Sequence, residues 1–151
     1  MLPLLRSLDL HVFPNPGHGD CLAYAIADAS YGFFPVESVR ARAQLFIAAH
    51  PQDSVVRNLT AHERVSLGRN GAWLSDNQLK VIAVALQSDF LILDFPTSLA
   101  RYMECGRGEV TYLSYTVCRN MMLNRRNDQA NPLRIIKYTV GHYEGVCWID
   151  R

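Results

Sequence analysis

Residues 17–26 read GHGDCLAYAI and place Cys21 where a glycine-containing loop meets a run of small and apolar residues. The apolar residues of this run recur at helical spacing, which predicts a helix over residues 21–30. A thiol at a helix N-terminus lies at the positive end of the helix dipole, which lowers the thiol pKa and favours a nucleophilic role. A cysteine at the start of a core helix can also serve packing alone. The rest of the chain has to distinguish these two roles.

A nucleophilic cysteine needs backbone donors for the oxyanion that forms during acyl transfer. Gly17 and Gly19 let the backbone turn tightly and present N–H groups beside the thiol. The sequence therefore predicts an oxyanion hole built from the backbone amides of His18, Gly19, Asp20 and Cys21.

The nucleophile also needs a general base, and His142 is the strongest candidate among the five histidines. It heads a predicted strand far along the chain, so only folding can bring it to Cys21, as is usual for Cys/His pairs. Glu144 lies two residues further on and shares a strand face with His142, so its carboxylate can orient the imidazole. Asp150 has the same parity but lies roughly 26 Å away in a continuous strand. A structural histidine and an exposed strand carboxylate are the alternatives.

Cysteine and histidine are also zinc ligands, and zinc sites use closely spaced ligand pairs. His18 and Cys21 have roughly that spacing, but the sequence offers no second pair. We therefore expect no metal and no other cofactor. Cys105, Cys118 and Cys147 are expected to be packing residues.

The composition is that of a folded domain with nearly balanced charge. Of 151 residues, 49% are hydrophobic and 19% charged, and the net charge is +1, which gives no reason to expect nucleic acid or an anionic membrane as a partner. No apolar run approaches the ~18–20 residues of a membrane span, and the N-terminus lacks the layout of a signal peptide. Four cysteines without a C-x-x-C pair predict free thiols in a reducing compartment, which favours the cytoplasm.

The remaining pattern predicts a single domain over residues 1–151, in which residues 1–13 form a leading segment packed on the domain. Capping boxes begin at Thr60 and Ser75 and mark two helix starts. Helices come first and strands last, and two strands meet at a tight joint near the C-terminus, which indicates the α+β class. The pattern predicts helices over residues 21–30, 36–50, 60–67 and 75–88, and strands over residues 90–95, 110–118, 133–140 and 143–149.

Three blocks, in order along the chain, resemble the ovarian tumour (OTU) family of cysteine proteases. GHGDCLAYAI resembles the family's cysteine block, whose usual form is G-D-G-N-C-L-F-R-A. Residues 71–93, GAWLSDNQLKVIAVALQSDFLIL, resemble its central block, in which a Trp precedes a helix and an apolar strand follows. GHYEGV, residues 141–146, resembles the histidine block, in which His-Tyr opens a strand. The resemblance covers about residues 14–150.

This resemblance implies a papain-type OTU fold, with a small and mostly antiparallel sheet packed between helices, and hydrolysis of bonds at the C-terminus of ubiquitin. By position, Cys21 would be the nucleophile, His142 the general base and Glu144 the third residue, where many members have Asp or Asn. His18 stands where the family has an Asp that helps hold the oxyanion loop. Asp20 stands where the family has Asn, and a carboxylate beside a thiol tends to raise the thiol pKa. How this loop is braced is therefore open.

The implied partner is ubiquitin or polyubiquitin, with ubiquitin-like modifiers as further substrates, and we expect a monomer. The divergence resembles viral and bacterial-effector members, for which the compartment is the host cytoplasm and polyprotein processing a second activity. Gly141, Tyr143 and Trp148 would help form the channel for the narrow substrate tail, and Trp73 could be a cleft wall or a core residue. The alternatives are a catalytically inactive ubiquitin-binding module, another Cys/His peptidase or amidase, and a structural domain.

Overall fold

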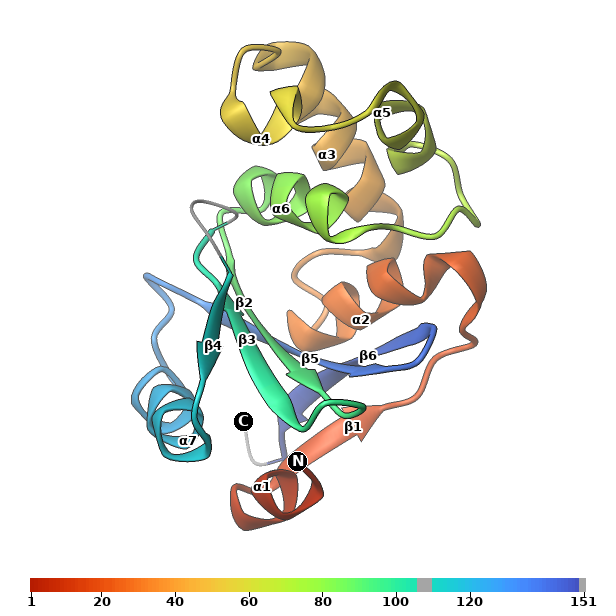
Figure 1. The fold of residues 1–151 in the computed structure, drawn as a ribbon. Coiled ribbons are helices and arrows are strands. Elements are labelled where there is room, and N and C mark those ends of the chain that lie inside the picture. The colour runs from red at the N-terminus through yellow and green to blue at the C-terminus, as the bar shows by residue number, and fades with distance from the viewer. Residues whose placement is uncertain (106–109, 150–151) are drawn as a thin grey trace.

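A computed structural model describes residues 1–105 and 110–149 of the chain. The strands in this part are β1 (Leu10–Phe13), β2 (Asp89–Asp94), β3 (Leu99–Met103), β4 (Thr111–Leu113), β5 (Leu133–Thr139) and β6 (His142–Trp148). They form one six-stranded sheet in the order β1-β6-β5-β2-β3-β4 (Figure 1). Neighbouring strands are antiparallel except β2 and β5, which run parallel.

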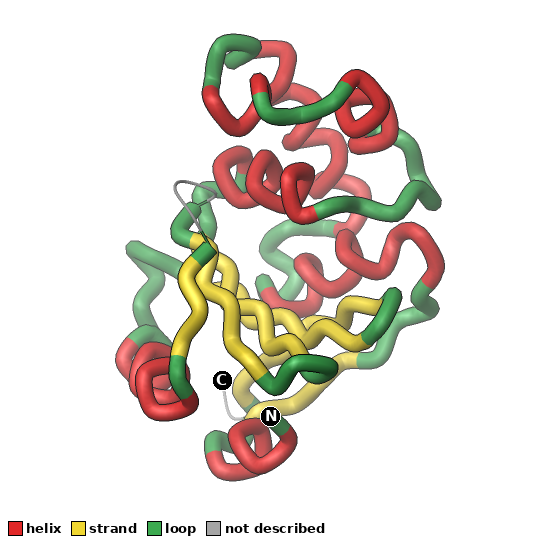
Figure 2. Tube along the Cα trace, viewed as in Figure 1, coloured by secondary structure: helices red, strands yellow, loops and turns green. Residues whose placement is uncertain are grey.

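Helices cover both faces of this sheet, as Figures 1 and 2 show. The group on one side consists of α2 (Cys21–Ala29), α3 (Val36–Ala49), α4 (Ser54–Arg57), α5 (Ala61–Leu67) and α6 (Asp76–Ala85). The helices α1 (Leu2–Ser7) and α7 (Tyr115–Asn124) lie on the other side. A single 3-10 turn, η1 (His18–Asp20), leads directly into α2. The expected α+β fold with a mostly antiparallel sheet between helices is confirmed.

The sheet separates two hydrophobic cores because its central strand is buried on both faces. Along β2, Phe90 and Ile92 belong to the core that includes α2, α3 and α6. Leu91 and Leu93 belong to the core that includes α1 and α7. Successive side chains of a strand point to opposite faces, so a strand covered on both sides is apolar throughout. The buried strand predicted over residues 90–95 is therefore confirmed.

Both predicted capping boxes are present. The Thr60 side chain accepts from the N–H of Glu63, and the Glu63 carboxylate accepts from the N–H of Thr60. Ser75 and Gln78 make the same exchange at the start of α6. Each box satisfies backbone N–H groups that a helix start leaves open. The start of α6 is thereby fixed, and with it the position of the preceding loop that carries Trp73.

The strand predicted over residues 110–118 is wrong in its second half. Strand β4 ends and α7 begins within this segment. The Ser114 side chain caps α7 by accepting from the backbone N–H three residues further on, and Cys118 and Met122 bury its inner face one turn apart. Local capping and burial outweigh the β propensity of the Thr, Tyr and Val residues there. Strand β3 has no counterpart among the predicted strands.

Residues 1–13, expected as a leading segment packed on the domain, contribute a strand to the sheet and a helix to its second core. Strand β1 pairs with β6 at the sheet edge, with Leu10 opposite Trp148. Leu4 and Leu5 of α1 are buried in the second core. This segment therefore completes the fold.

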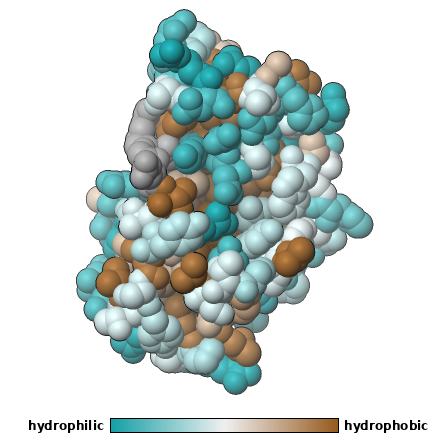
Figure 3. All heavy atoms as spheres, viewed as in Figure 1, coloured by the Kyte–Doolittle hydropathy of each residue, from teal (hydrophilic) through white to brown (hydrophobic). Residues whose placement is uncertain are grey.

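On the face drawn in Figure 3, apolar residues lie in small groups among polar ones. Single exposed apolar side chains are normal on the surface of a folded domain. None of the described helices combines the length and the apolar character that crossing a membrane demands.

Candidate active site

Cys21 is the first residue of α2, and its side chain is fully buried. Burial raises the pKa of the Cys21 thiol and outweighs the nearby backbone amides of Tyr143, Leu22 and Cys21, which act to lower it. The Asp20 carboxylate contributes to the increase. The thiol is therefore neutral at rest near neutral pH.

His142 is the first residue of β6 and lies beside the loop that leads to Cys21. A methyl group placed on Gly17 would lie 3.3 Å from both Nδ1 and Cε1 of the His142 ring, so this edge of the imidazole faces the loop. The next residue in β6, Tyr143, is near enough to Cys21 that its backbone amide acts to lower the pKa of the thiol. The start of β6 therefore lies against the start of α2 and the loop before it.

The side chain of Asn15 links the start of α2, the start of β6 and the loop that precedes Cys21. Its Nδ2 donates to the backbone oxygen of Tyr143 at 2.9 Å and to that of Cys21 at 3.4 Å. Its Oδ1 accepts from the N–H of Gly17 at 2.9 Å. This role does not follow from the sequence, because an Asn among prolines and glycine indicates only a turn. The partner in β6 is distant in the sequence and leaves no local signal.

Glu144 lies on the same face of β6 as His142, as strand parity predicts. Its Oε2 is 3.7 Å from Nε2 of His142, and its Oε1 is 3.8 Å from Nζ of Lys137 on β5. Both distances exceed a hydrogen bond, so the carboxylate supports the imidazole by charge and does not fix the ring. Asp150, the alternative third residue, lies outside the described residues.

The predicted oxyanion loop is the turn η1, and its backbone is strained. His18 has φ +61°, a left-handed conformation that costs a non-glycine residue roughly 1–2 kcal/mol. The N–H of Cys21 donates to the backbone oxygen of His18 within this turn. One of the four predicted oxyanion donors is therefore engaged in the resting structure. The earlier amides of the turn have no acceptor inside it, as at any helix start.

Arg40 of α3 holds this loop from its inner side. Its side chain is buried and donates five hydrogen bonds of 2.6 to 3.1 Å through its two terminal nitrogens. The acceptors are the backbone oxygens of Gly19, Ser66, Leu67 and Ala72 and the carboxylate of Asp20. A buried guanidinium is stable only when it is paired and hydrogen-bonded. These acceptors satisfy both terminal nitrogens, while the buried Nε makes no hydrogen bond within the described part of the chain.

Asp20 is turned toward Arg40 and Gly71. Its Oδ1 accepts from Nη2 of Arg40 at 3.0 Å and from the N–H of Gly71 at 2.8 Å. As the N-cap of α2 it makes no side-chain cap hydrogen bond to that helix. The carboxylate therefore serves the contact between two loops, although its charge still raises the pKa of the Cys21 thiol.

The oxyanion loop and the loop over residues 69–73 touch backbone to backbone. A Cβ placed on Gly19 would overlap the backbone carbonyl of Gly71. Only glycine permits this approach, which explains why Gly19 is needed beyond any freedom to turn. Through Gly19 and Arg40, the position of the nucleophile's loop is set by the loop that carries Trp73.

Trp73 and Tyr143 form a stacked aromatic pair beside Cys21. Their ring centroids are 5.3 Å apart with an interplanar angle of 22°, and Tyr138 lies 5.1 Å further along. Trp73 is 45% exposed and Tyr143 4% exposed, so the tryptophan is the ring that can meet a substrate and the tyrosine supports it. This exposure excludes the expectation that Trp73 is a core residue. Gly141 occupies the β5–β6 turn with φ +72°, immediately before His142.

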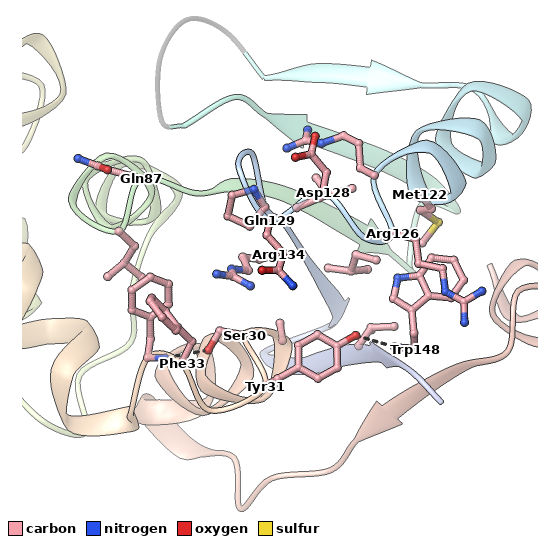
Figure 4. Close-up of a pocket in the computed structure, with 18 of the residues that line it drawn as sticks. Ser30, Tyr31, Phe33, Gln87, Met122, Arg126, Asp128, Gln129, Arg134 and Trp148 are labelled. Carbon is pink, nitrogen blue, oxygen red and sulfur yellow. Dashed lines mark hydrogen bonds between the residues drawn. The ribbon is translucent and has the colours of Figure 1, made fainter. Parts of the chain in front are cut away.

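Trp148 lies at the opposite end of β6 from His142, roughly 20 Å away at the rise of a strand. It is buried in the second core, where the Arg126 guanidinium lies 4.3 Å above its ring. The Tyr31 hydroxyl accepts from the backbone N–H of Trp148 at 2.9 Å. It lines a cavity of about 620 Å³ between the end of α2, the end of α7 and the start of β5 (Figure 4). This placement corrects the expectation that Trp148 helps form the channel at Gly141.

Among residues 1–105 and 110–149, no three His, Cys, Asp or Glu side chains gather closely enough to hold a metal ion. What the site presents is a thiol, an imidazole, a carboxylate and backbone amides. These are the groups that a nucleophilic acyl transfer uses.

A thiol at a helix N-terminus beside a strand-borne histidine is an arrangement that cysteine proteases use. No family model matches the sequence, and comparison with curated proteins finds no match. Comparison with solved structures shows that the fold is that of OTU domains, which confirms the fold that the three sequence blocks implied.

Three of these structures illustrate the likeness. The OTU domain of OTUD1 has a TM-score of 0.65 and 17% identity, covering 95% of this chain and 89% of that chain. The OTU deubiquitinase of Wolbachia pipientis wMel bound to ubiquitin has a TM-score of 0.62 and 12% identity, covering 91% and 95%. The viral OTU domain protease of Dera Ghazi Khan virus has a TM-score of 0.61 and 16% identity, covering 93% and 82%.

Proposed function

We propose that this protein is an OTU-type deubiquitinase, a thiol hydrolase that cleaves isopeptide and peptide bonds at the C-terminal glycine of ubiquitin. The observation that carries the proposal is the arrangement at the junction of α2 and β6, where Cys21 begins the helix, His142 lies against Gly17 and Glu144 lies 3.7 Å from Nε2 of His142. Support comes from OTU domains of the same fold, several of them in complex with ubiquitin. Ubiquitin-like modifiers are further substrates under this proposal, and polyprotein processing is a second activity.

The proposed reaction begins with the neutral thiol that burial favours. His142 takes the Cys21 proton as the sulfur attacks the carbonyl carbon of the terminal glycine, and the C–S bond forms. Backbone amides of the η1 turn stabilise the oxyanion. His142 then gives its proton to the leaving lysine amine as the C–N bond breaks. Water attacks the thioester with His142 as base, and the thiol is regenerated.

Glu144 contributes through its charge in this scheme. The imidazole becomes positive when it takes the thiol proton, and a carboxylate 3.7 Å from Nε2 stabilises that charge. Trp73 stacks on Tyr143 and the turn at Gly141 directly precedes His142, and we propose that the narrow tail of ubiquitin passes along them. Cys21 is fully buried at rest, so neighbouring side chains have to move for the tail to reach the sulfur.

The buried thiol and the engaged Cys21 amide favour a second candidate, a module that binds ubiquitin without cleaving it. A ubiquitin probe with a C-terminal electrophile separates the two. We expect a covalent adduct with the wild-type protein and with Cys105→Ala, and no adduct with Cys21→Ala. Ubiquitin binding without an adduct would establish the inactive module. An adduct that persists in Cys21→Ala would overturn the nucleophile assignment.

The proposed setting of this activity is the cytoplasm, that of a host cell for a viral or effector protein. All four cysteines of the chain are free. Free buried thiols are the usual state of cysteines in a reducing compartment.

A further inference from the structure

The loop that precedes Cys21 is held at its start by Asn15, whose Oδ1 accepts from the N–H of Gly17. It contains two glycines, and His18 adopts a left-handed conformation. The start of α2 has no side-chain cap, because the carboxylate of its N-cap residue Asp20 is directed at Arg40 and Gly71. Oxyanion donors work only when they are fixed before the reaction, so another group has to fix this loop.

We propose that Arg40 is the positioning residue that sets the oxyanion loop, an inference that rests on the proposed function. Nη2 of Arg40 donates to the backbone oxygen of Gly19 at 3.1 Å. The C=O and N–H of a trans peptide point in opposite directions. Anchoring the Gly19 carbonyl on Arg40 therefore directs the N–H of Asp20 to the other side of the loop, where it serves as an oxyanion donor.

Arg40 also ties this loop to the rest of the site. The same Nη2 donates to the oxygen of Ala72 at 2.6 Å, one residue before Trp73. Nη1 donates to the last turn of α5 through the oxygens of Ser66 and Leu67, both at 3.1 Å. One guanidinium thus fixes the oxyanion loop and the Trp73 loop against a helix end that belongs to the core.

This role requires arginine. Two terminal nitrogens in a rigid plane reach acceptors in three segments at once, whereas a lysine ammonium is a single point with three donors. The sequence gives no sign of it, since Arg40 lies among ordinary residues of a predicted helix and all of its acceptors are distant in the chain.

The test compares Arg40→Met, Arg40→Lys and Asp20→Asn with Arg42→Met, an exposed arginine on the same helix. Two Cys21-dependent hydrolyses are measured, one of a ubiquitin C-terminal amide and one of a small activated ester. Alkylation of Cys21 by iodoacetamide is followed in parallel, because that substitution forms no oxyanion. Hydrogen exchange reports the protection of residues 17–21 and 69–73.

We expect Arg40→Met to lower kcat about 10²-fold, the effect of losing an oxyanion donor, on both substrates, with little change in KM. Arg40→Lys should show most of this loss and Asp20→Asn less of it, while Arg42→Met behaves as wild type. Iodoacetamide alkylation should continue at a rate close to that of wild type. Protection should fall in the two loops and stay in β2 and β5.

Retained protection of both loops in Arg40→Met would overturn the proposal, and so would unchanged kcat in a variant whose thermal stability alone has dropped. A parallel loss of alkylation would also overturn it, because the defect would then lie in the thiol. If the wild-type protein cleaves the ester but not the ubiquitin amide, the proposed function fails and the Arg40 comparison still stands on the ester. If the wild-type protein cleaves neither substrate, the role of Arg40 is decided by whether Arg40→Met loses hydrogen-exchange protection in the two loops.

Discussion

Burial raises the pKa of the Cys21 thiol and outweighs the nearby backbone amides, which favour the thiolate. At rest the site therefore holds a neutral thiol, which is a poor target for oxidants and alkylating agents. In the proposed reaction His142 therefore takes the thiol proton as the sulfur attacks.

Glu144 offers a test of how much the carboxylate matters. Glu144→Gln should lower kcat/KM about tenfold, well short of the ~10⁴-fold loss for a carboxylate that bonds its histidine directly. The reason is the 3.7 Å separation from Nε2 of His142. Steady-state hydrolysis of a ubiquitin C-terminal amide measures it. Lys137→Met is the matched control: it removes the competing cation at 3.8 Å, so activity should be kept or increased.

A loss as large in Lys137→Met as in Glu144→Gln would mean that the ion pair serves the fold of β5 and β6. Asp150→Asn completes the comparison. If that variant alone is inactive, strand parity has identified the wrong carboxylate.

At the scale of elements, the site depends on two loops whose glycines have different tasks. Gly19 is needed because the Gly71 carbonyl occupies the space of a side chain, whereas nothing lies within 4 Å of a Cβ at Gly71. Gly71 is needed for its φ of +84°. The first requirement is a contact between loops, and the second is local to one turn.

These tasks predict different costs for the two alanine variants. Gly71→Ala should lose about 1 kcal/mol of unfolding free energy and keep its activity, since only a left-handed conformation is penalised. Gly19→Ala should lose more stability and nearly all activity, because the loops must separate and break the contacts of Asp20 and Arg40. Denaturant unfolding and amide hydrolysis measure both. Equal losses in the two variants would show that the loop contact is loose.

The elements that could be predicted are those whose cause is local. The capping boxes at Thr60 and Ser75 lie within four residues, so the starts of α5 and α6 follow from the sequence. The second half of residues 110–118 was misassigned because β propensity is a weak preference, and the cap at Ser114 with one buried face decided the outcome. A Ser followed by apolar residues four apart is a signal that periodicity alone could have found.

The candidate site follows the same division. The roles of Cys21, His142 and Glu144 stay predictions, and the one contact among them that the structure gives is the 3.7 Å approach of Glu144 to Nε2 of His142, which strand parity predicts. Asn15 and Arg40 do not follow, because their partners are backbone oxygens far away in the chain and backbone acceptors leave no mark on a sequence. Trp148 was expected near Gly141 but lies at the other end of β6. Strand parity predicts which face of the sheet a residue lies on, but it does not predict how far along the strand that residue is from the site.

At the scale of the whole molecule, one sheet supports two cores, and the site lies where helix and sheet meet on one side of it. Residues 1–13 pair with β6, the strand that carries His142. This strand is therefore held on both edges, by β1 and by β5. Such support gives the candidate site, whose loops are rich in glycine, one rigid wall.

Two buried groups predict how the stability of the whole fold depends on pH. Burial raises the pKa of Cys118 from its ordinary 9.0 to about 11. Burial likewise raises the pKa of Tyr143 from 10.0 to about 12. Both groups are neutral below their ordinary values in the folded and the unfolded chain, so their burial imposes no pH dependence there. As pH rises, the unfolded chain loses these protons first, binds fewer protons than the folded state, and is favoured.

The free energy of unfolding should therefore fall as pH rises from about 9 to about 12, the interval between the ordinary and the raised values of the two groups. Denaturant unfolding under reducing conditions at a series of pH values measures it. Tyr143→Phe keeps the ring between Trp73 and Tyr138 and removes the titrating hydroxyl, so its curve should be flatter between pH 10 and 12. Cys118→Ala should be less stable at pH 8 and flatter between pH 9 and 11. Curves parallel to that of the wild type would show that these groups ionise alike in both states, and the burial argument would fail.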